Sequence, residues 1–386
     1  MEIYLDNCAT TRVCEEATAA CLQAMTGSYG NPSSLHRKGL EAEAILTETR
    51  KTVGRMLSCP PECIHFTANA TESNNLAIMG SAAAYPRNGR TIVTTSVEHS
   101  SVSQAAAALE NRGYIVKRVS PQPDGRFSAA DFLEAVDEDT LLISFMMVNN
   151  ETGAILPYET VIPALRRKFP KLLIHMDAVQ GFAKYPLNLK RLDLDFLSFS
   201  GHKLYAPKGV GVLYVKKGIR LIPLAYGGGQ ERGLRPGTQA VELIAALREA
   251  LLLCQREGKA WAARYRALNQ RLREGASSLP RVTVNSPEDG APHILNLSVL
   301  GVRSEIMLHF LEERGIFVSS GSACSKGANS PTLAAFGLTP EQIDSALRIS
   351  FSKDTTEADI DALLAALAEG IAKFRPIIEK NGKDRL

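Results

Sequence analysis

The stretch Phe196-Leu197-Ser198-Phe199-Ser200-Gly201-His202-Lys203 decides the predicted fold. Its first five residues form a short apolar run, and a glycine and two basic residues follow at once. A run of this length that is bounded by glycine is typical of a buried β-strand. We therefore predict a strand over Phe196–Ser200 that ends directly before Gly201.

The same pattern recurs on both sides of this stretch, where apolar β-rich runs alternate with alanine-rich helical runs from about residue 40 to 220. Continuous apolar strands separated by helices predict a mostly parallel, seven-stranded sheet covered on both faces, in an α/β fold. Such sheets bind ligands beyond the carboxyl ends of their strands. The predicted strands are Ile64–Thr67, Thr91–Thr95, Ile115–Val119, Leu141–Val148, Leu172–Asp177, Phe196–Ser200 and Val210–Val215, and the predicted helices are Glu41–Leu57, Glu72–Ala84, Ser101–Asn111, Ala129–Val136 and Thr160–Lys168.

The pattern changes after Gly227-Gly228-Gly229, where a long helix precedes shorter strands and a Gly/Ser-rich loop at Ser319–Gly327. A chain of 386 residues also exceeds the roughly 250–300 residues at which single cores stop growing. We therefore predict a large domain over residues 14–250. Residues 1–13 and 251–386 are predicted to form a smaller α+β domain.

The composition excludes several classes of protein. The 44 basic and 41 acidic residues nearly balance, which argues against direct nucleic-acid binding. No apolar stretch approaches the roughly 18 residues that span a membrane, and the first residues do not resemble a signal peptide, so we expect a cytoplasmic protein. Seven scattered cysteines argue against a disulfide framework, and Cys59 and Cys63 lack the second pair of a structural zinc site, so no metal is expected.

Two of the predicted strands deliver residues suited to a pyridine aldehyde. Lys203 follows its strand directly, and a lysine with a neutral amine forms an imine with an aldehyde. Asp177 ends the preceding strand, where it could pair with a protonated pyridine nitrogen, and Gln180 could donate to a phenolic oxygen on the ring. The alternatives are a surface lysine, a helix-capping aspartate, and a metal pair formed by His175 and Asp177.

Other strand ends offer groups for the rest of such a ligand. Ala70 and Thr71 open a helix after a strand, where free amides suit a phosphate, and Ser200 and His202 could close its other side. The alternative for Thr71 is a plain helix cap. His99 could stack on a flat ring and move protons, or be an ordinary structural histidine. Asn150 could reach the same ligand. Together these strand ends fit one phosphorylated pyridine aldehyde.

The sequence resembles the cysteine desulfurases, the NifS/IscS-like group in the class-V aminotransferase family of fold-type I pyridoxal enzymes. The resemblance extends over nearly the whole chain and its motifs occur in the family's order. They are Tyr4-Leu5-Asp6-Asn7, Gly30-Asn31-Pro32-Ser33-Ser34, Ala70-Thr71-Glu72-Ser73-Asn74-Asn75, Val148-Asn149-Asn150-Glu151, Asp177-Ala178-Val179-Gln180, Ser200-Gly201-His202-Lys203, Arg235-Pro236-Gly237-Thr238 and Ser320-Gly321-Ser322-Ala323-Cys324.

This resemblance implies a role for each candidate residue. Pyridoxal 5'-phosphate would form a Schiff base with Lys203. Asp177 would pair with the protonated pyridine nitrogen, and His99 would stack on the ring and act as an acid or base. Thr238 would reach the phosphate of the neighbouring subunit's cofactor, which implies a homodimer, and Arg348 would grip the substrate carboxylate. Matches to the remaining cofactor or substrate positions are Ala70, Thr71, Asn150, Gln180, Ser200 and His202.

Cys324 is the residue that favours cysteine desulfuration over the other activities of this family. It lies in a stretch of small and polar residues, Ser319–Gly327, where a buried core cysteine would be rare and a reactive one is common. The resemblance implies that L-cysteine is converted to L-alanine and that the sulfur stays on Cys324 as a persulfide. A sulfur-acceptor protein, such as an iron–sulfur scaffold or a tRNA-thiolation enzyme, would then receive it.

Two residues depart from the family pattern, since Asn69 stands where glycine is usual and Cys8 where serine or alanine is more frequent. We expect both to have small effects. The alternative activities on the same scaffold are selenocysteine lyase, cysteine-sulfinate desulfinase and class-V aminotransferase. The alternatives from other classes are a cofactor-free α/β interaction scaffold and a dinucleotide-binding enzyme, although Gly227-Gly228-Gly229 lacks the glycine spacing of the latter.

Overall fold

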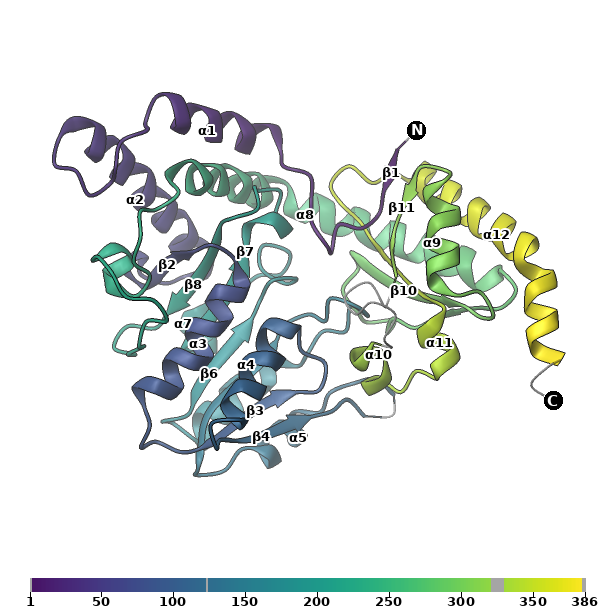
Figure 1. The fold of residues 1–386 in the computed structure, drawn as a ribbon, viewed down its shortest axis with the longest axis horizontal. Helices are drawn as coiled ribbons and strands as arrows, with labels where there is room; N and C mark the ends of the chain where they lie inside the picture. Colours follow the sequence, from purple (N-terminus) through teal and green to yellow (C-terminus); the bar gives the residue numbers. More distant parts are fainter. Residues whose placement is uncertain (1, 123, 321–329, 384–386) are drawn as a thin grey trace.

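The computed structural model describes residues 2–122, 124–320 and 330–383. A seven-stranded sheet forms the larger part of the molecule, in the strand order β2-β8-β7-β6-β5-β3-β4 (Figure 1). The four pairs among β3 to β7 are parallel, and β8 is antiparallel to both β7 and β2. This confirms the predicted sheet. The strands are β2 (Ile64–Thr67), β3 (Thr91–Thr95), β4 (Ile115–Val119), β5 (Thr140–Met146), β6 (Leu173–Asp177), β7 (Phe196–Ser200) and β8 (Gly211–Val215).

Helices cover both faces of this sheet, so every residue of its central strands β3, β5, β6, β7 and β8 is buried. Phe196 of β7 packs in a cluster with side chains of α3 and α4, whereas Leu197 and Phe199 join the large core that contains α6 and α8. Alternating side chains of one strand therefore serve opposite faces. The elements of this part are α1 (Glu15–Thr26), α2 (Arg37–Leu57), η1 (Pro61–Cys63), α3 (Ala70–Ala84), α4 (Ser100–Glu110), α5 (Ala129–Ala135), α6 (Tyr158–Lys168), α7 (Leu189–Leu192), η2 (Gly201–Lys203), η3 (Gln230–Gly233) and α8 (Val241–Ser278).

A second, four-stranded antiparallel sheet has the order β12-β13-β10-β9. The predicted loop at Ser319–Gly327 is wrong at its start, because Ser319 and Ser320 form β12 and pair with Arg348 and Leu347 of β13. The strands and helices here are β9 (Val282–Val284), β10 (Ile294–Val299), α9 (Ser304–Glu312), β11 (Ile316–Phe317), β12 (Ser319–Ser320), α10 (Pro331–Ala335), α11 (Pro340–Asp344), β13 (Ala346–Ser350) and α12 (Glu357–Lys383).

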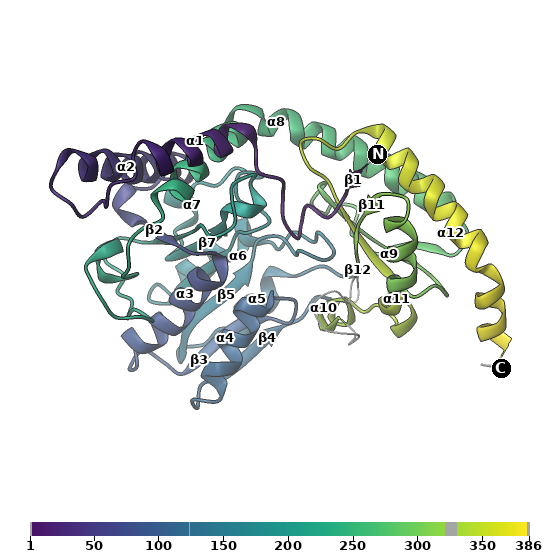
Figure 2. The same cartoon turned by 45° about the horizontal axis from the view of Figure 1, so that its top comes forward.

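Two segments connect the sheets. The long helix α8 packs against α1 and α2 near its start and against β9 and α12 farther along (Figure 2). The N-terminal segment starts as β1 (Ile3–Tyr4), pairs with β11, and then crosses to the large sheet. We call residues 5–11 the N-terminal strap. Within it, the Leu5 carbonyl accepts from Ser350 N at 2.7 Å, and Thr11 N donates to the His202 carbonyl at 2.9 Å.

None of the helices in the described ranges is both long enough and apolar enough to cross a membrane.

We predict that Thr11→Val destabilises the protein by about 1–3 kcal/mol. The Thr11 hydroxyl donates to the His202 carbonyl at 3.0 Å and accepts from Tyr205 N at 2.8 Å, so valine leaves both buried backbone groups without this partner. Urea denaturation measures the change in free energy of unfolding. Thr26→Val is the matched control, because the Thr26 hydroxyl makes only a solvent-exposed bond to Leu22 O. Equal effects of the two substitutions would contradict this account of the strap.

Candidate active site

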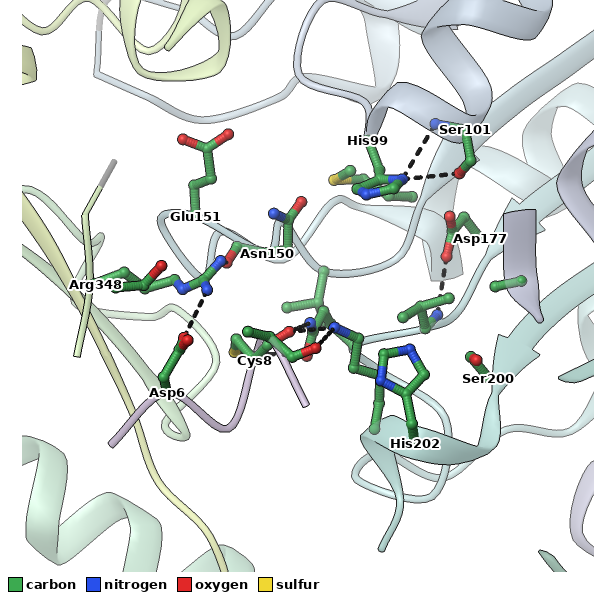
Figure 3. A pocket seen from close by; sticks show the side chains of 18 of the residues that line it. Asp6, Cys8, His99, Ser101, Asn150, Glu151, Asp177, Ser200, His202 and Arg348 are labelled. Atoms are coloured by element: carbon green, nitrogen blue, oxygen red, sulfur yellow. Dashed lines mark hydrogen bonds and ion pairs between the residues drawn. The ribbon is translucent and has the colours of Figure 1, made fainter. Parts of the chain in front are cut away.

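A cavity of about 420 Å³ lies at the carboxyl ends of the parallel strands, where the two sheets face each other (Figure 3). The segments that follow β2, β3, β5, β6 and β7 all contribute to its wall, as the sequence analysis predicted. The strap and β13 complete the wall from the other side. The predicted site residues that line this cavity are Ala70, Thr71, His99, Asn150, Asp177, Gln180, Ser200, His202, Lys203 and Arg348.

Lys203 lies in the short helix η2, directly after β7. The turn between them is tight, since a Cβ on Gly201 would lie 2.9 Å from Cγ1 of Val210. The Lys203 amine donates to the backbone carbonyls of Cys8 at 2.5 Å and Ala9 at 2.6 Å, both in the strap. Burial lowers the pKa of this amine to about 8, and the nearby positive charge of Arg348 acts in the same direction. The neutral fraction, which imine formation requires, is therefore minor but much larger at neutral pH than that of an unperturbed lysine.

Asp177, the last residue of β6, presents a buried carboxylate to the cavity. Its Oδ2 accepts from Asn74 Nδ2 at 2.8 Å, and its Oδ1 accepts from Val179 N at 2.9 Å. Burial raises the pKa of the Asp177 carboxyl, and these two hydrogen bonds oppose that change. A cation in the cavity would favour the ionised carboxylate in the same way, so the site suits a positively charged partner.

The metal pair of His175 and Asp177, which the sequence left as an alternative, receives no support from the contacts of His175. That ring is fully buried in the sheet, with Nδ1 at 2.7 Å from Ser144 Oγ and Nε2 at 3.0 Å from Ser198 Oγ. Burial also lowers the pKa of His175 to about 3. Both ring nitrogens are therefore engaged by serine hydroxyls from the neighbouring strands β5 and β7, as in a structural histidine.

A chain of hydrogen bonds connects His99 to Asp177. The His99 Nδ1 accepts from Ser101 N at 3.1 Å and lies 2.9 Å from Ser101 Oγ, which in turn accepts from Asn74 Nδ2 at 2.8 Å. Burial lowers the pKa of His99, which keeps its ring neutral at neutral pH. Because Nδ1 is an acceptor, the proton of the neutral ring lies on Nε2. His99 is thus oriented as a hydrogen-bond donor through Nε2.

The start of α3 forms a corner of the cavity that suits an anion. Asn69 caps the helix by accepting from Glu72 N at 2.9 Å, and the amides of the first turn have no partners within the helix itself. The backbones are close here, because a Cβ on Gly211 would lie 2.6 Å from the carbonyl carbon of Asn69. The extended backbone of Asn69 suits any residue, so the change from the usual glycine is accommodated and adds a cap.

Ser200 and His202 complete this corner. The Ser200 hydroxyl is buried and has no hydrogen-bond partner among the described residues. A buried polar atom of this kind is rare unless a ligand or water engages it. His202 lies beside Thr10, with Nδ1 at 3.2 Å from Thr10 Oγ1, and burial lowers the pKa of its ring to about 4. The corner therefore combines neutral donors with a helix N-terminus, as phosphate sites do.

Arg348, on β13, holds the opposite end of the cavity. Its Nη2 donates to Asp6 Oδ1 at 2.9 Å and its Nη1 donates to the Asn150 carbonyl at 3.1 Å (Figure 3). Its Nε is buried and has no partner within the described residues. The guanidinium is thus oriented from two sides and keeps donor capacity for a carboxylate in the cavity.

The structure adds residues that the sequence analysis did not assign to the site. Asp6 orients Arg348, and Asn74 and Ser101 connect Asp177 with His99. Cys8 also lines the cavity, with its thiol 3.6 Å from Gln180 Oε1 and its carbonyl accepting from Gln180 Nε2 at 3.1 Å. Asp6 and Asn74 belong to sequence motifs that the chain shares with the family. Their hydrogen bonds to Arg348 and Asp177 become visible only in the folded structure.

Two predicted site residues are not among the described residues that line this cavity. Thr238 is exposed on the surface of the single chain and does not line the cavity. Cys324 lies in residues 321–329, outside the described part of the structure.

The family model for class-V aminotransferases matches residues 3–363. The chain belongs to the class-V aminotransferase family. A NifS/IcsS protein homolog of Lactobacillus delbrueckii is 39% identical over 97% of this chain and 98% of its own length. Cysteine desulfurase IscS of Serratia proteamaculans is 38% identical over 98% of this chain and 94% of its own length. A solved NifS-like protein superposes with a TM-score of 0.91 at 36% identity, covering 96% of this chain and 100% of that one. These findings confirm the predicted family, fold and enzyme class.

We predict that, in the cofactor-free protein, the rate at which amine-modifying reagents react with Lys203 rises with pH and reaches its half-maximum near pH 8. This midpoint follows from burial, which lowers the pKa of the Lys203 amine to about 8. Because burial disfavours the charged amine, the reactive neutral form increases as the pH passes upward through this value. Mass spectrometry of Lys203 after timed modification across a pH series measures the midpoint. N-acetyl-lysine serves as the control and should react with a midpoint of about 10.4. Coincidence of the two midpoints would show that the site does not perturb Lys203.

Proposed function

We propose that this protein is a cysteine desulfurase that uses pyridoxal 5'-phosphate and holds it on Lys203. The observation that carries the proposal is the meeting of three groups in one cavity. They are a lysine with a lowered pKa, a buried carboxylate at Asp177 and the oriented guanidinium of Arg348. The names of the relatives support the same activity.

The residues present fit this cofactor. Lys203 would hold its aldehyde carbon, Asp177 its ring nitrogen, and Gln180 its phenolic oxygen. The corner built by the start of α3 and the unpartnered Ser200 hydroxyl suits the phosphate, and His99 and Asn150 face the space between these ends (Figure 3). When bound, pyridoxal phosphate supplies an electron sink that stabilises negative charge at the substrate α-carbon.

The chain's own side chains would orient L-cysteine and move its protons. Arg348 would bind the substrate carboxylate through guanidinium hydrogens that Asp6 and Asn150 do not engage. Lys203, which is partly neutral near neutral pH, would take the α-proton on Nζ. His99 carries a proton on Nε2 and would donate from that atom, since its Nδ1 is occupied by Ser101.

Sulfur transfer is assigned to Cys324. Its thiolate would attack the substrate sulfur, so that an S–S bond forms as the substrate's Cβ–S bond breaks. The Cβ atom then takes one proton, the proton held on Lys203 returns to the α-carbon, and L-alanine leaves. The persulfide on Cys324 would pass its terminal sulfur to an acceptor protein, such as an iron–sulfur scaffold or a tRNA-thiolation enzyme.

We also propose a homodimer in the cytoplasm. Thr238 would complete the partner subunit's phosphate site, which is consistent with its exposure in the single chain. Exposed apolar side chains that a second subunit could cover are concentrated in residues 22–40, with another at Tyr226. The six described cysteines are free thiols, as expected in a reducing compartment.

The two-domain division, residues 14–250 against 1–13 and 251–386, belongs to the same proposal. It is supported by the two separate sheets and by the pairing of β1 with β11.

Cys324→Ala is expected to lower sulfide formation from L-cysteine at least about a hundredfold and to abolish the protein persulfide. The visible absorption band of the cofactor should remain, because this substitution leaves the described cavity intact. Sulfide is measured in the presence of a reductant, and the persulfide is detected by mass spectrometry as the gain of one sulfur atom. Cys21→Ala, which changes a half-buried thiol outside the cavity, is the control. Undiminished desulfuration by Cys324→Ala would refute the proposed function.

A further inference from the structure

The charged side chains that line the cavity are unequal in number. Among the described residues they comprise three carboxylates, Asp6, Glu151 and Asp177, against the cations Lys203 and Arg348. Burial lowers the pKa values of both lining histidines, His99 and His202, so neither adds a positive charge at neutral pH. Asp6 orients Arg348 and Asp177 lies at the end of β6, but the roles derived so far do not use Glu151.

Glu151 is held firmly at the Arg348 end of the cavity. Its backbone amide donates to Asn149 Oδ1 at 3.0 Å, and its carbonyl accepts from Asn296 Nδ2 at 3.3 Å. Its carboxylate oxygen Oε2 accepts from the Ser330 hydroxyl at 2.7 Å. Figure 3 shows Glu151 on the same side of the cavity as Arg348, with Asn150 beside them. The carboxylate is directed toward Ser330, and the Glu151 side chain lines the end of the cavity where the guanidinium of Arg348 lies.

The surroundings of Glu151 act on the pKa of its carboxyl in opposite directions. Burial raises the pKa of its carboxyl, whereas the Ser330 hydroxyl and the positive charge of Arg348 favour the ionised form. The side chain of Thr332 also hydrogen-bonds this carboxyl, and Asp6 and Lys203 line the same cavity. In a site shielded from water, a second negative charge nearby is costly, since the repulsion between like charges is weakly screened.

We propose that Glu151 is a specificity-determining residue that restricts the cavity to amino acids with an uncharged side chain and rejects those with an anionic one. This inference rests on the proposed function and names its substrate class. The α-carboxylate of any amino acid is compensated by Arg348. An additional sulfinate or carboxylate on the side chain approaches Glu151, and the described lining residues provide no cation for it beyond Lys203 and Arg348. L-cysteine carries a neutral thiol and avoids this repulsion.

L-aspartate and L-asparagine have side chains of nearly the same size and shape, but only the aspartate side chain is charged. A comparison of their binding therefore measures the effect of side-chain charge alone. Calorimetry of the cofactor-loaded protein measures the dissociation constant of each without turnover. We expect the wild type to bind asparagine more tightly than aspartate, and Glu151→Gln to reduce the ratio of the two constants about tenfold. The glutamine Oε1 can still accept from Ser330, so the local hydrogen bond is retained. Glu159→Gln removes a charge at an exposed position of α6 and should leave the ratio unchanged.

Two further variants keep the test decisive. Glu151→Asp retains the charge and should retain discrimination against aspartate, whereas Glu151→Ala is a second uncharged replacement and should lose it. A folded, cofactor-loaded Gln or Ala variant with the wild-type ratio would overturn the inference, as would an equal change in Glu159→Gln. Desulfuration of L-cysteine by the wild type is measured separately. Its absence would contradict the proposed function, whereas an unchanged binding ratio would contradict only the role of Glu151.

Discussion

The site depends on the burial of one amine at the end of a β-strand. Lys203 is placed by the tight turn after β7, and its buried Nζ must find acceptors. The backbone carbonyls of Cys8 and Ala9 provide them, and these residues belong to the strap that crosses between the sheets. Because the acceptors are neutral carbonyls, they hold the amine without the strong charge stabilisation that a carboxylate partner would give. The amine can therefore be both ordered and partly neutral.

The strap extends this constraint to the other end of the cavity. Asp6 orients Arg348, and Thr11 holds the backbone beside His202 and Tyr205. The strap thus positions Lys203, which would act at the reacting carbon of a substrate. It also positions Arg348, which would bind the substrate carboxylate. A small shift of the strap would move Asp6 and the carbonyls of Cys8 and Ala9 together. This coupling explains why residues near the start of the chain contribute to a site built on distant strands.

Much of this arrangement could be predicted from the sequence, and the rest could not for physical reasons. Apolar runs followed by Asp177 and Lys203 identify strand ends, and parallel strands must bring their carboxyl ends to one edge. The ion pair of Asp6 and Arg348 joins residues 342 positions apart, so no local pattern reveals it. The carbonyls that hold Lys203 are backbone groups, which every residue carries. Ser101 and Asn74 are ordinary helix residues until the fold places them between His99 and Asp177.

We propose Lys203 as the residue that anchors the cofactor and on which these groups converge. The most direct measurement is to incubate the protein with pyridoxal 5'-phosphate, reduce it with borohydride, and locate the modified lysine by peptide mass spectrometry. The account predicts a single major adduct on Lys203. Lys184 and Lys208 are close in the fold or the sequence and serve as internal comparisons. A major adduct on either of them, or the absence of any stable adduct, would contradict the account.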